Sequence, residues 1–266
     1  MAYKLIAIDL DGTLLNKDQK ISQENKASIT KAKQAGIEIV LASGRSYESI
    51  DRYNKELGLS GYTIATAGGF VADGAGKIVY SSYMPPLAAL QIMRWAALRE
   101  LHFQVYMDDG FYYMQPNRFL EEYEKVVGIK GHADPSLLDR KQVLAAKIVL
   151  IDEPSRLRQY REELAAHFPE MKIGFSMPNF LEIMHPETDK GHALKYIADK
   201  LSVEQPQIIA IGDSDIDCGM LEYAGLGVAT GNATRSLQKA ANYICTENDD
   251  KCVSEVINKY IMFYSA

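Results

Sequence analysis

Short runs of almost entirely apolar residues recur near both ends of the chain, and each run breaks into a polar or glycine-containing turn. Residues 5–8, 37–42 and 208–211 form such runs. Continuous apolar stretches of strand length are typical of strands buried on both faces of a parallel sheet. Between the runs, apolar residues recur with the spacing of amphipathic helices. The pattern therefore predicts an α/β fold with an open parallel sheet.

The middle of the chain has a pattern of its own. Two prolines, Pro85 and Pro86, break the first series of strands and helices. A separate set of predicted helices and strands follows, with a hairpin turning at Asp108-Asp109-Gly110. We therefore predict a Rossmann-like open parallel-sheet core interrupted by an inserted α/β domain. The predicted core comprises residues 1–83 and 187–266, and the predicted insertion comprises 84–186.

Local signals set the ends of several predicted elements. Ser22 is expected to cap a helix that Gly36 ends, and Ser46 to begin a helix that Gly58 ends. The other predicted elements are helices at 87–101, 117–127, after 154 and at 252–261, and strands at 103–106, 111–113, 147–151 and around 175 and 181.

Two carboxylates stand where the first apolar run ends. Asp9 and Asp11 are two residues apart and directly precede Gly12, and ligands of open α/β sheets bind beyond the carboxyl ends of the strands. Two like charges this close do not both ionise freely, so one can remain charged as a nucleophile while the other holds a proton to donate. Taken alone, the segment is equally compatible with a strand followed by an acidic turn.

Two further blocks offer groups that suit an anion. Ser43 and Gly44 follow the second apolar run and supply a hydroxyl and backbone amides at an expected helix start. Ser43 could also be a simple helix cap, because capping and phosphate binding use the same geometry. Lys190 opens a predicted helix, where a positive charge is unfavourable unless an anion is present. The alternative for Lys190 is a surface side chain.

A last block places Asp213, Asp215 and Asp217 just after the run at 208–211. Carboxylate oxygens at this density are ligands for a hard cation such as magnesium. An acidic loop of this kind can also be merely solvated.

In this order, the blocks resemble the motifs of the haloacid dehalogenase-like phosphohydrolases, specifically the Cof-type branch with a large α/β cap. The resemblance covers nearly the whole chain. It implies that Asp9 is a nucleophile that forms an aspartyl-phosphate and that Asp11 is the general acid and later the base for water. It also implies that Ser43, with Gly44, and Lys190 bind the transferring phosphoryl group.

The resemblance further implies a magnesium ion. Asp9, the backbone carbonyl of Asp11, and Asp213 would hold the ion, and Asp217 would support the metal site from close by. The physical reason is that an ionised Asp9 attacking a phosphate dianion must overcome charge repulsion, which Mg²⁺ and Lys190 would offset.

Two positions depart from the family pattern. Ile216 and Ala67 stand where the family usually has asparagine, so both changes would make the site less polar beside the phosphate. We expect Ile216 to lie at the site and narrow the range of substrates; the alternative is that it points into the apolar core beneath the loop. Asn232 matches a family motif near the substrate, but it could instead cap the helix that follows.

Composition is that of an ordinary globular protein, with 47% hydrophobic and 24% charged residues. The net charge of −6 and the absence of a lysine and arginine run argue against nucleic acid as a partner. No stretch reads as a signal peptide or a membrane span. Cys218, Cys245 and Cys252 lack metal-ligand spacing, so reduced thiols in a cytoplasmic protein are the simplest expectation.

The predicted function is a magnesium-dependent phosphatase that acts on a small phosphorylated metabolite, such as a sugar phosphate. A second possibility is a phosphosugar mutase. A third, from a different class, is a phospho-ligand-binding regulator with a degraded site.

Overall fold

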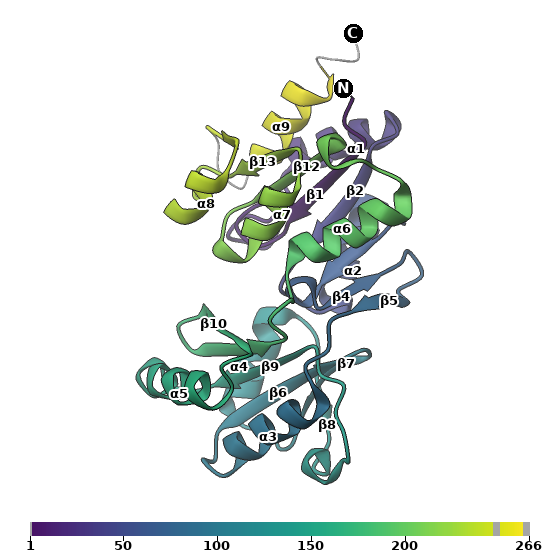
Figure 1. The fold of residues 1–266 in the computed structure, drawn as a ribbon. Helices are drawn as coiled ribbons and strands as arrows, with labels where there is room; N and C mark the ends of the chain where they lie inside the picture. The colour runs from purple at the N-terminus through teal and green to yellow at the C-terminus, as the bar shows by residue number, and fades with distance from the viewer. Residues whose placement is uncertain (1, 247–250, 263–266) are drawn as a thin grey trace. The chain divides into compact units, whose positions relative to one another are not determined.

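The computed structural model describes residues 2–246 and 251–262. It confirms the predicted α/β class, because strands and helices alternate along the chain (Figure 1). The chain forms two compact units. The first unit comprises residues 1–44, 50–80 and 189–266, and the second comprises residues 45–49 and 81–188.

Within the described residues, the first unit contains an eight-stranded sheet in the order β14-β13-β12-β1-β2-β3-β4-β5. β1 pairs in parallel with β12 on one side and with β2 on the other. β4 then pairs antiparallel with β3. The strands are β1 (Leu5–Asp9), β2 (Glu38–Ala42), β3 (Thr63–Ala65), β4 (Phe70–Ala72), β5 (Ile78–Ser81), β12 (Ile208–Gly212), β13 (Leu226–Ala229) and β14 (Tyr243–Ile244).

Helices cover the sheet of the first unit. α6, α7 and α8 bury apolar side chains in one cluster with β1, β2 and β12, and Figure 1 shows α6 and α7 over the same face. α1 and α9 pack on each other, and the Ser254 amide donates to Asn25 Oδ1 over 3.0 Å. The helices are α1 (Gln23–Gln34), α2 (Tyr47–Leu57), α6 (Lys190–Leu201), α7 (Cys218–Tyr223), α8 (Arg235–Ala240) and α9 (Cys252–Tyr260), with short 3-10 turns η1 (Thr66–Gly68), η3 (Gln205–Gln207) and η4 (Asp215–Asp217).

The second unit has a sheet of its own, six-stranded in the part of the chain that is described, in the order β10-β11-β9-β6-β7-β8. α3 and α5 pack on one apolar cluster, and α4 contributes to another. The elements are α3 (Pro86–Ala97), β6 (His102–Met107), β7 (Gly110–Tyr113), α4 (Arg118–Val127), β8 (His132–Ala133), η2 (Leu137–Asp139), β9 (Lys147–Ile151), α5 (Pro154–His167), β10 (Lys172–Met177) and β11 (Phe180–Met184).

The predicted limits of the first two helices are confirmed to within two residues. The Ser22 hydroxyl accepts a hydrogen bond from the Asn25 amide at the start of α1. α2 runs from Tyr47 to Leu57, so it begins directly after Ser46 and ends directly before Gly58, as predicted.

The expectation of reduced thiols is wrong for two of the three cysteines. Cys245 and Cys252 form a disulfide, with their Cα atoms 5.6 Å apart, and Cys218 is free. Cys245 directly follows β14, and Cys252 is the first residue of α9. The tertiary packing of the strand and the helix brings the two together, which cysteine spacing alone does not reveal.

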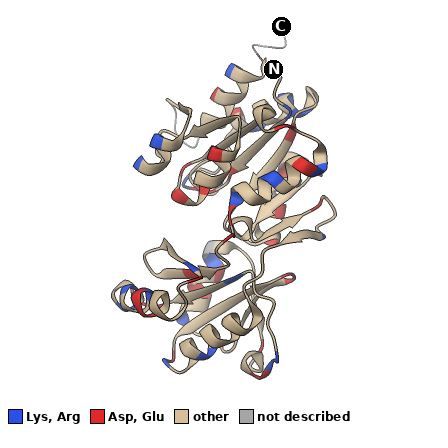
Figure 2. Ribbon diagram, viewed as in Figure 1, with Lys and Arg blue, Asp and Glu red and all other residues tan. Residues whose placement is uncertain are grey.

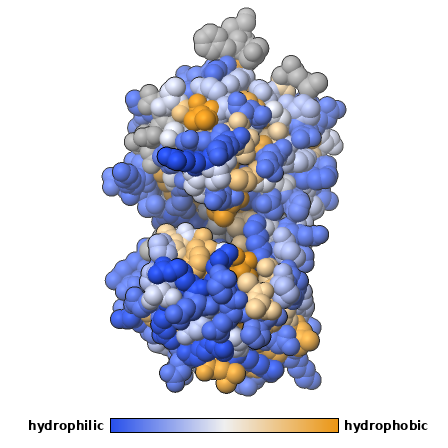
Figure 3. All heavy atoms as spheres, turned by 60° about the vertical axis from the view of Figure 1, so that its left-hand side comes forward, coloured by the Kyte–Doolittle hydropathy of each residue, from blue (hydrophilic) through white to orange (hydrophobic). Residues whose placement is uncertain are grey.

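Charged residues of both signs are interspersed over the helices of both units (Figure 2). The face drawn in Figure 3 is mostly hydrophilic, and its apolar atoms form separate patches. Among the described residues, every helix is too short or too polar to cross a membrane.

Candidate active site

The candidate site lies where three neighbouring strands of the first unit end. Asp9 is the last residue of β1, Ser43 directly follows β2, and Asp213 directly follows β12. The three strands are parallel, with Asp9 aligned to Ala42 and Ile8 aligned to Ile211. Parallel strands direct their carboxyl ends to the same edge of the sheet, so segments about 200 residues apart in the sequence meet there.

Lys190 connects two of these carboxylates. Its ammonium group donates to Asp9 Oδ1 over 2.6 Å, to Asp217 Oδ1 over 2.6 Å and to the Ala42 carbonyl over 3.0 Å. These three acceptors match the three donors of an ammonium group. The side chain is fully buried, so the alternative of a surface lysine is wrong.

Neighbouring charges keep this buried lysine protonated. Burial alone would lower the pKa of Lys190, but the charges of Asp217 and Asp9 outweigh burial, and the net shift is upward. Lys190 is the first residue of α6, as predicted, and the Asp189 carboxylate accepts from the Gly191 amide at the same helix end. The opposing carboxylates explain why a cation is tolerated there.

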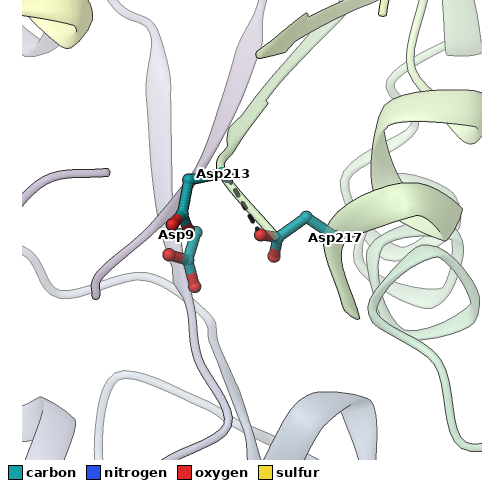
Figure 4. Close-up of side chains that lie close together, drawn as sticks. All are labelled: Asp9, Asp213 and Asp217. Carbon is teal, nitrogen blue, oxygen red and sulfur yellow. Dashed lines mark hydrogen bonds between the residues drawn. The ribbon is translucent and has the colours of Figure 1, made fainter. Parts of the chain in front are cut away.

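Three carboxylates converge at this strand edge. One oxygen each from Asp9, Asp213 and Asp217 lies within 4.8 Å of the others, and Figure 4 shows the three side chains together. Burial, followed by the charge of Asp217, raises the pKa of Asp9 well above its ordinary value. Burial, again followed by the charge of Asp217, raises the pKa of Asp213 to about 7.

The donor set fits a hard divalent cation. The cluster contains three carboxylates and one ammonium group, so its net charge is −2 when all four groups are ionised. Clustered carboxylate oxygens are ligands that Mg²⁺ and similar ions prefer. Burial and the neighbouring negative charge, which together raise the pKa values of Asp9 and Asp213, would both be offset by a bound cation.

Asp217 orders the loop beside the cluster. Its Oδ2 accepts from the amides of Asp213 and Ser214, over 3.1 and 3.0 Å, and from the Ser214 hydroxyl over 3.1 Å. Its Oδ1 accepts from Lys190. Both oxygens are engaged and the side chain is fully buried, so Asp217 positions Asp213 and Lys190.

The loop after β1 packs closely on Asp213. Gly12 has a φ of +82°, and a Cβ built on it would lie 2.3 Å from Asp213 Oδ2. Both the backbone conformation and the space therefore require glycine. The Thr13 hydroxyl donates to Asp213 Oδ1 over 3.4 Å. Asp11 is exposed on this loop, and its side chain lies outside the three-carboxylate cluster.

Ser43 is held by its backbone between two strand ends. Its amide donates to the Ile64 carbonyl, and its carbonyl accepts from the Ala67 amide, each over 2.9 Å. Its side chain is buried. Because α2 begins at Tyr47, four residues beyond Ser43, the alternative of Ser43 as a simple helix cap is wrong. The anion-binding hypothesis for Ser43 and Gly44 stays a prediction.

A model of the haloacid dehalogenase-like hydrolase family matches residues 6–257. The chain belongs to this family. The family resemblance drawn from the motifs is thus confirmed, and so is the expectation of an enzyme of the phosphatase type.

Full-length relatives agree with the family assignment. YxeH from Bacillus subtilis is 33% identical, and the match covers 98% of this chain and 99% of the relative. Bacillus subtilis YwtE, named as a 5-amino-6-(5-phospho-D-ribitylamino)uracil phosphatase, is 29% identical over 97% of this chain and 98% of its own. The crystal structure of a haloacid dehalogenase-like hydrolase from Bacteroides thetaiotaomicron is 28% identical, with a TM-score of 0.88 and coverage of 97% and 99%.

Asn232 occupies a defined place in this member of the family. Its amide nitrogen donates to the Gly12 carbonyl over 2.9 Å. The cap of α8 is Thr234, whose hydroxyl accepts from the Leu237 amide. The alternative of Asn232 as a helix cap is therefore wrong, and its side chain instead supports the loop that carries Asp11.

The two departures from the family pattern flank the Ser43-Gly44 turn. Ile216, on η4, is 37% exposed, and its Cδ1 lies 3.8 Å from the position of a Cβ built on Gly44. The alternative that Ile216 points into the core is therefore wrong. Ala67 is buried at a φ of +57° and donates its amide to the Ser43 carbonyl.

Three threonines were not singled out from the sequence. Thr13 contacts Asp213, and the motif Asp-Gly-Thr could have drawn attention to it. Thr66 and Thr230 directly follow β3 and β13, and both are fully buried. Within the described chain their hydroxyl oxygens have no hydrogen-bond partner. Their positions after strand ends were the available signal.

Proposed function

We propose that the protein is a magnesium-dependent phosphatase that hydrolyses a small phosphorylated metabolite through an aspartyl-phosphate on Asp9. The observation that carries the proposal is the buried contact of Lys190 with Asp9 and Asp217 beside a third carboxylate, Asp213. This arrangement combines a nucleophile, a fixed positive charge and a cation-binding donor set at one strand edge.

Asp9 is the proposed nucleophile because of its place in the cluster. It ends β1 and is almost fully buried, so its orientation is fixed by the strand. In the proposed first step, an Asp9 oxygen bonds to phosphorus, and the bond from phosphorus to the alcohol oxygen breaks. Water then attacks the aspartyl-phosphate and releases inorganic phosphate and the Asp9 carboxylate.

Asp11 is the proposed acid and base. It lies exposed on the loop after β1, two residues beyond Asp9. In the first step it would protonate the departing alkoxide, and in the second it would accept the proton of the attacking water. Asn232 and Thr13 would support this loop through Gly12 and Asp213 respectively.

Positive charge and backbone donors would hold the phosphoryl group. Lys190 supplies a permanent ammonium, and Ser43 with Gly44 would supply a hydroxyl and an amide. Asp9, Asp213 and the Asp11 carbonyl would hold Mg²⁺, with Asp217 as the positioning residue. When bound, the ion would lower the repulsion between the Asp9 carboxylate and the phosphate and stabilise charge in the transition state.

The second unit is proposed to act as the cap that selects the substrate. Residues 84–186 form most of it, and the small phosphorylated metabolite as the class of substrate is carried over from the family resemblance. YwtE, whose name specifies a phosphorylated ribityl compound, is an example of a relative that acts on a small phosphate ester.

Turnover of p-nitrophenyl phosphate tests the proposed function. We expect hydrolysis that depends on magnesium, that chelation abolishes and metal restores, and that is absent from the Asp9→Asn variant. Acid quenching during turnover should trap phosphate on the native chain and not on the variant. Binding of phosphate esters without turnover would instead support the regulator alternative.

A further inference from the structure

Ile216 is a large apolar side chain placed among polar neighbours at the candidate site. It lies on η4 between Asp215 and Asp217 and is 37% exposed. Its Cδ1 reaches to 3.8 Å from the Cβ position of Gly44, which is an ordinary van der Waals separation. The acidic loop therefore presents a methyl group of Ile216 to the position of Gly44.

The polar members of the same loop are engaged elsewhere. Asp217 binds Lys190 and the amides of Asp213 and Ser214. Asp215 accepts hydrogen bonds from the hydroxyls of Thr234 and Ser236. Next to Gly44, the side chain that this loop offers is the hydrocarbon of Ile216.

A second residue with an apolar side chain is bonded to the same turn through its backbone. The Ala67 amide donates to the Ser43 carbonyl, so this residue is tied to Ser43, while Ile216 lies beside Gly44. Ala67 carries only a methyl group. Two independent observations thus place residues whose side chains carry no hydrogen-bonding group next to the turn proposed to bind phosphate.

We infer that Ile216 is a specificity-determining residue, which favours phosphate esters whose alcohol portion presents an apolar surface near the phosphate and disfavours polyhydroxylated ones. This inference rests on the proposed function. Hydrocarbon placed against Ile216 leaves water and gains free energy. A hydroxyl placed there loses a hydrogen bond to water without a replacement and is penalised.

Two primary phosphate esters with six-membered rings test the inference. Cyclohexylmethyl phosphate and glucose 6-phosphate share this framework but differ in the ring oxygen and the hydroxyls. We expect the native enzyme to have the higher kcat/KM for cyclohexylmethyl phosphate. In Ile216→Asn, we expect the ratio of the two kcat/KM values to fall by about 10-fold, as for other single changes in apolar contact at a binding site.

Leu201→Asn is the matched control. Leu201 is also 37% exposed, and it ends α6, eleven residues beyond Lys190. Its substitution should leave the substrate ratio unchanged within about twofold, because a helix of this length separates it from the site. Both variants should keep the native melting temperature within a few degrees, since both positions are exposed. If Ile216→Asn is less stable, Ile216→Ser provides the same comparison.

Binding measurements separate this inference from the proposed function. Calorimetric titration of both esters into Asp9→Asn, with and without Ile216→Asn, reports the preference without turnover. A native preference for the apolar ester that Ile216→Asn removes supports the inference. A preference that is absent, or that Ile216→Asn leaves unchanged, overturns it. Selective binding to a native enzyme that turns over neither ester, nor p-nitrophenyl phosphate, overturns the proposed function alone.

Discussion

Each of the two units buries a lysine against carboxylates, but the local balance of charge differs. In the first unit, Lys190 is fully buried and faces a cluster of three carboxylates. In the second unit, Lys147 is 2% exposed and pairs with Glu182 over 3.0 Å, with its ammonium 4.7 Å from the centre of the Tyr106 ring.

The difference separates two uses of buried charge. One ammonium and one carboxylate, as in Lys147 and Glu182, balance each other, and an aromatic face adds a favourable contact. In the cluster of three carboxylates and one ammonium, burial, followed by the charge of Asp217, raises the pKa values of Asp9 and Asp213. Strongly perturbed carboxylates in a cluster are typical of functional sites. The Lys147–Glu182 pair suits support of the fold, and the Lys190 cluster suits ligand binding and chemistry.

The strongest test of this contrast removes one carboxylate charge from each unit. Asp9→Asn should lower turnover of p-nitrophenyl phosphate by about 10⁴-fold or more, because the amide is nearly isosteric but is not a nucleophile. Glu182→Gln, the matched change in the second unit, should retain turnover within a few-fold. Steady-state kinetics and circular dichroism on both variants measure this. Comparable losses of turnover in the two variants would contradict the contrast.

A second test separates the roles of Asp9, which ends β1, and Asp11, which lies two residues beyond it. Asp11→Asn should reduce kcat/KM by about 10²–10⁴-fold for an alkyl phosphate, whose alkoxide must be protonated as it leaves. The loss should be much smaller for p-nitrophenyl phosphate, since p-nitrophenolate is a good leaving group. Parallel kinetics on both substrates provide the measurement. Equal losses on the two substrates would remove Asp11 from the role of general acid.

The third test concerns pH and metal. Because the pKa of Asp213 is raised to about 7 from the ordinary 3.8, the folded state holds a proton that the unfolded state releases between these values. In metal-free protein, this contribution to stability is present below about pH 4 and is lost as the pH rises through about 7. Asp213→Asn should flatten this part of the profile.

Magnesium should stabilise the protein more as the pH rises, whereas the contribution of Asp213 in metal-free protein falls. It would bind the ionised carboxylates, so the rise in melting temperature on adding magnesium should be several degrees larger at pH 8 than at pH 5. Thermal denaturation from pH 4 to 8, with magnesium and with chelator, checks both expectations. A magnesium effect that is constant with pH, and that Asp213→Asn preserves, would show that the cluster is not the cation site.

The smallest expected effect comes from single hydrogen bonds of asparagine. Asn232→Ala removes the bond to the Gly12 carbonyl and should lower kcat by about 2- to 10-fold, in keeping with about 0.5–1.5 kcal/mol for one such bond. Asn117→Ala removes the cap of α4 in the second unit and should cost about 1 kcal/mol of stability. It should leave kcat unchanged. Chemical denaturation and steady-state kinetics on both variants measure these effects. A loss of kcat in Asn117→Ala, with none in Asn232→Ala, would contradict the expectation.

Sequence alone predicted those features that depend on strand ends. Asp9 and Asp213 could be placed together because each follows an apolar run, and parallel strands share one edge. Contacts made by helices were harder to predict. The position of Lys190 at a helix start was evident, but its bonds to Asp9, Asp217 and the Ala42 carbonyl depend on how α6 packs on the sheet.

Local signals failed where tertiary contacts decide the outcome. A serine after a strand resembles a helix cap, yet the Ser43 backbone is bound by Ile64 and Ala67 and the helix begins later. Asn232 likewise resembles a cap but reaches across to Gly12, 220 residues away in the sequence. Cysteine spacing gave no indication that β14 and α9 bring Cys245 and Cys252 together.

The bonds of Asp217 have a consequence for entropy. The buried Asp217 carboxylate accepts hydrogen bonds from the amides of Asp213 and Ser214, the Ser214 hydroxyl and the Lys190 ammonium. The backbone of this loop therefore loses its conformational entropy when the chain folds, and not when a ligand binds. A phosphate ester would meet donors and ligands already in place, so its binding energy remains available for orienting the reacting bond.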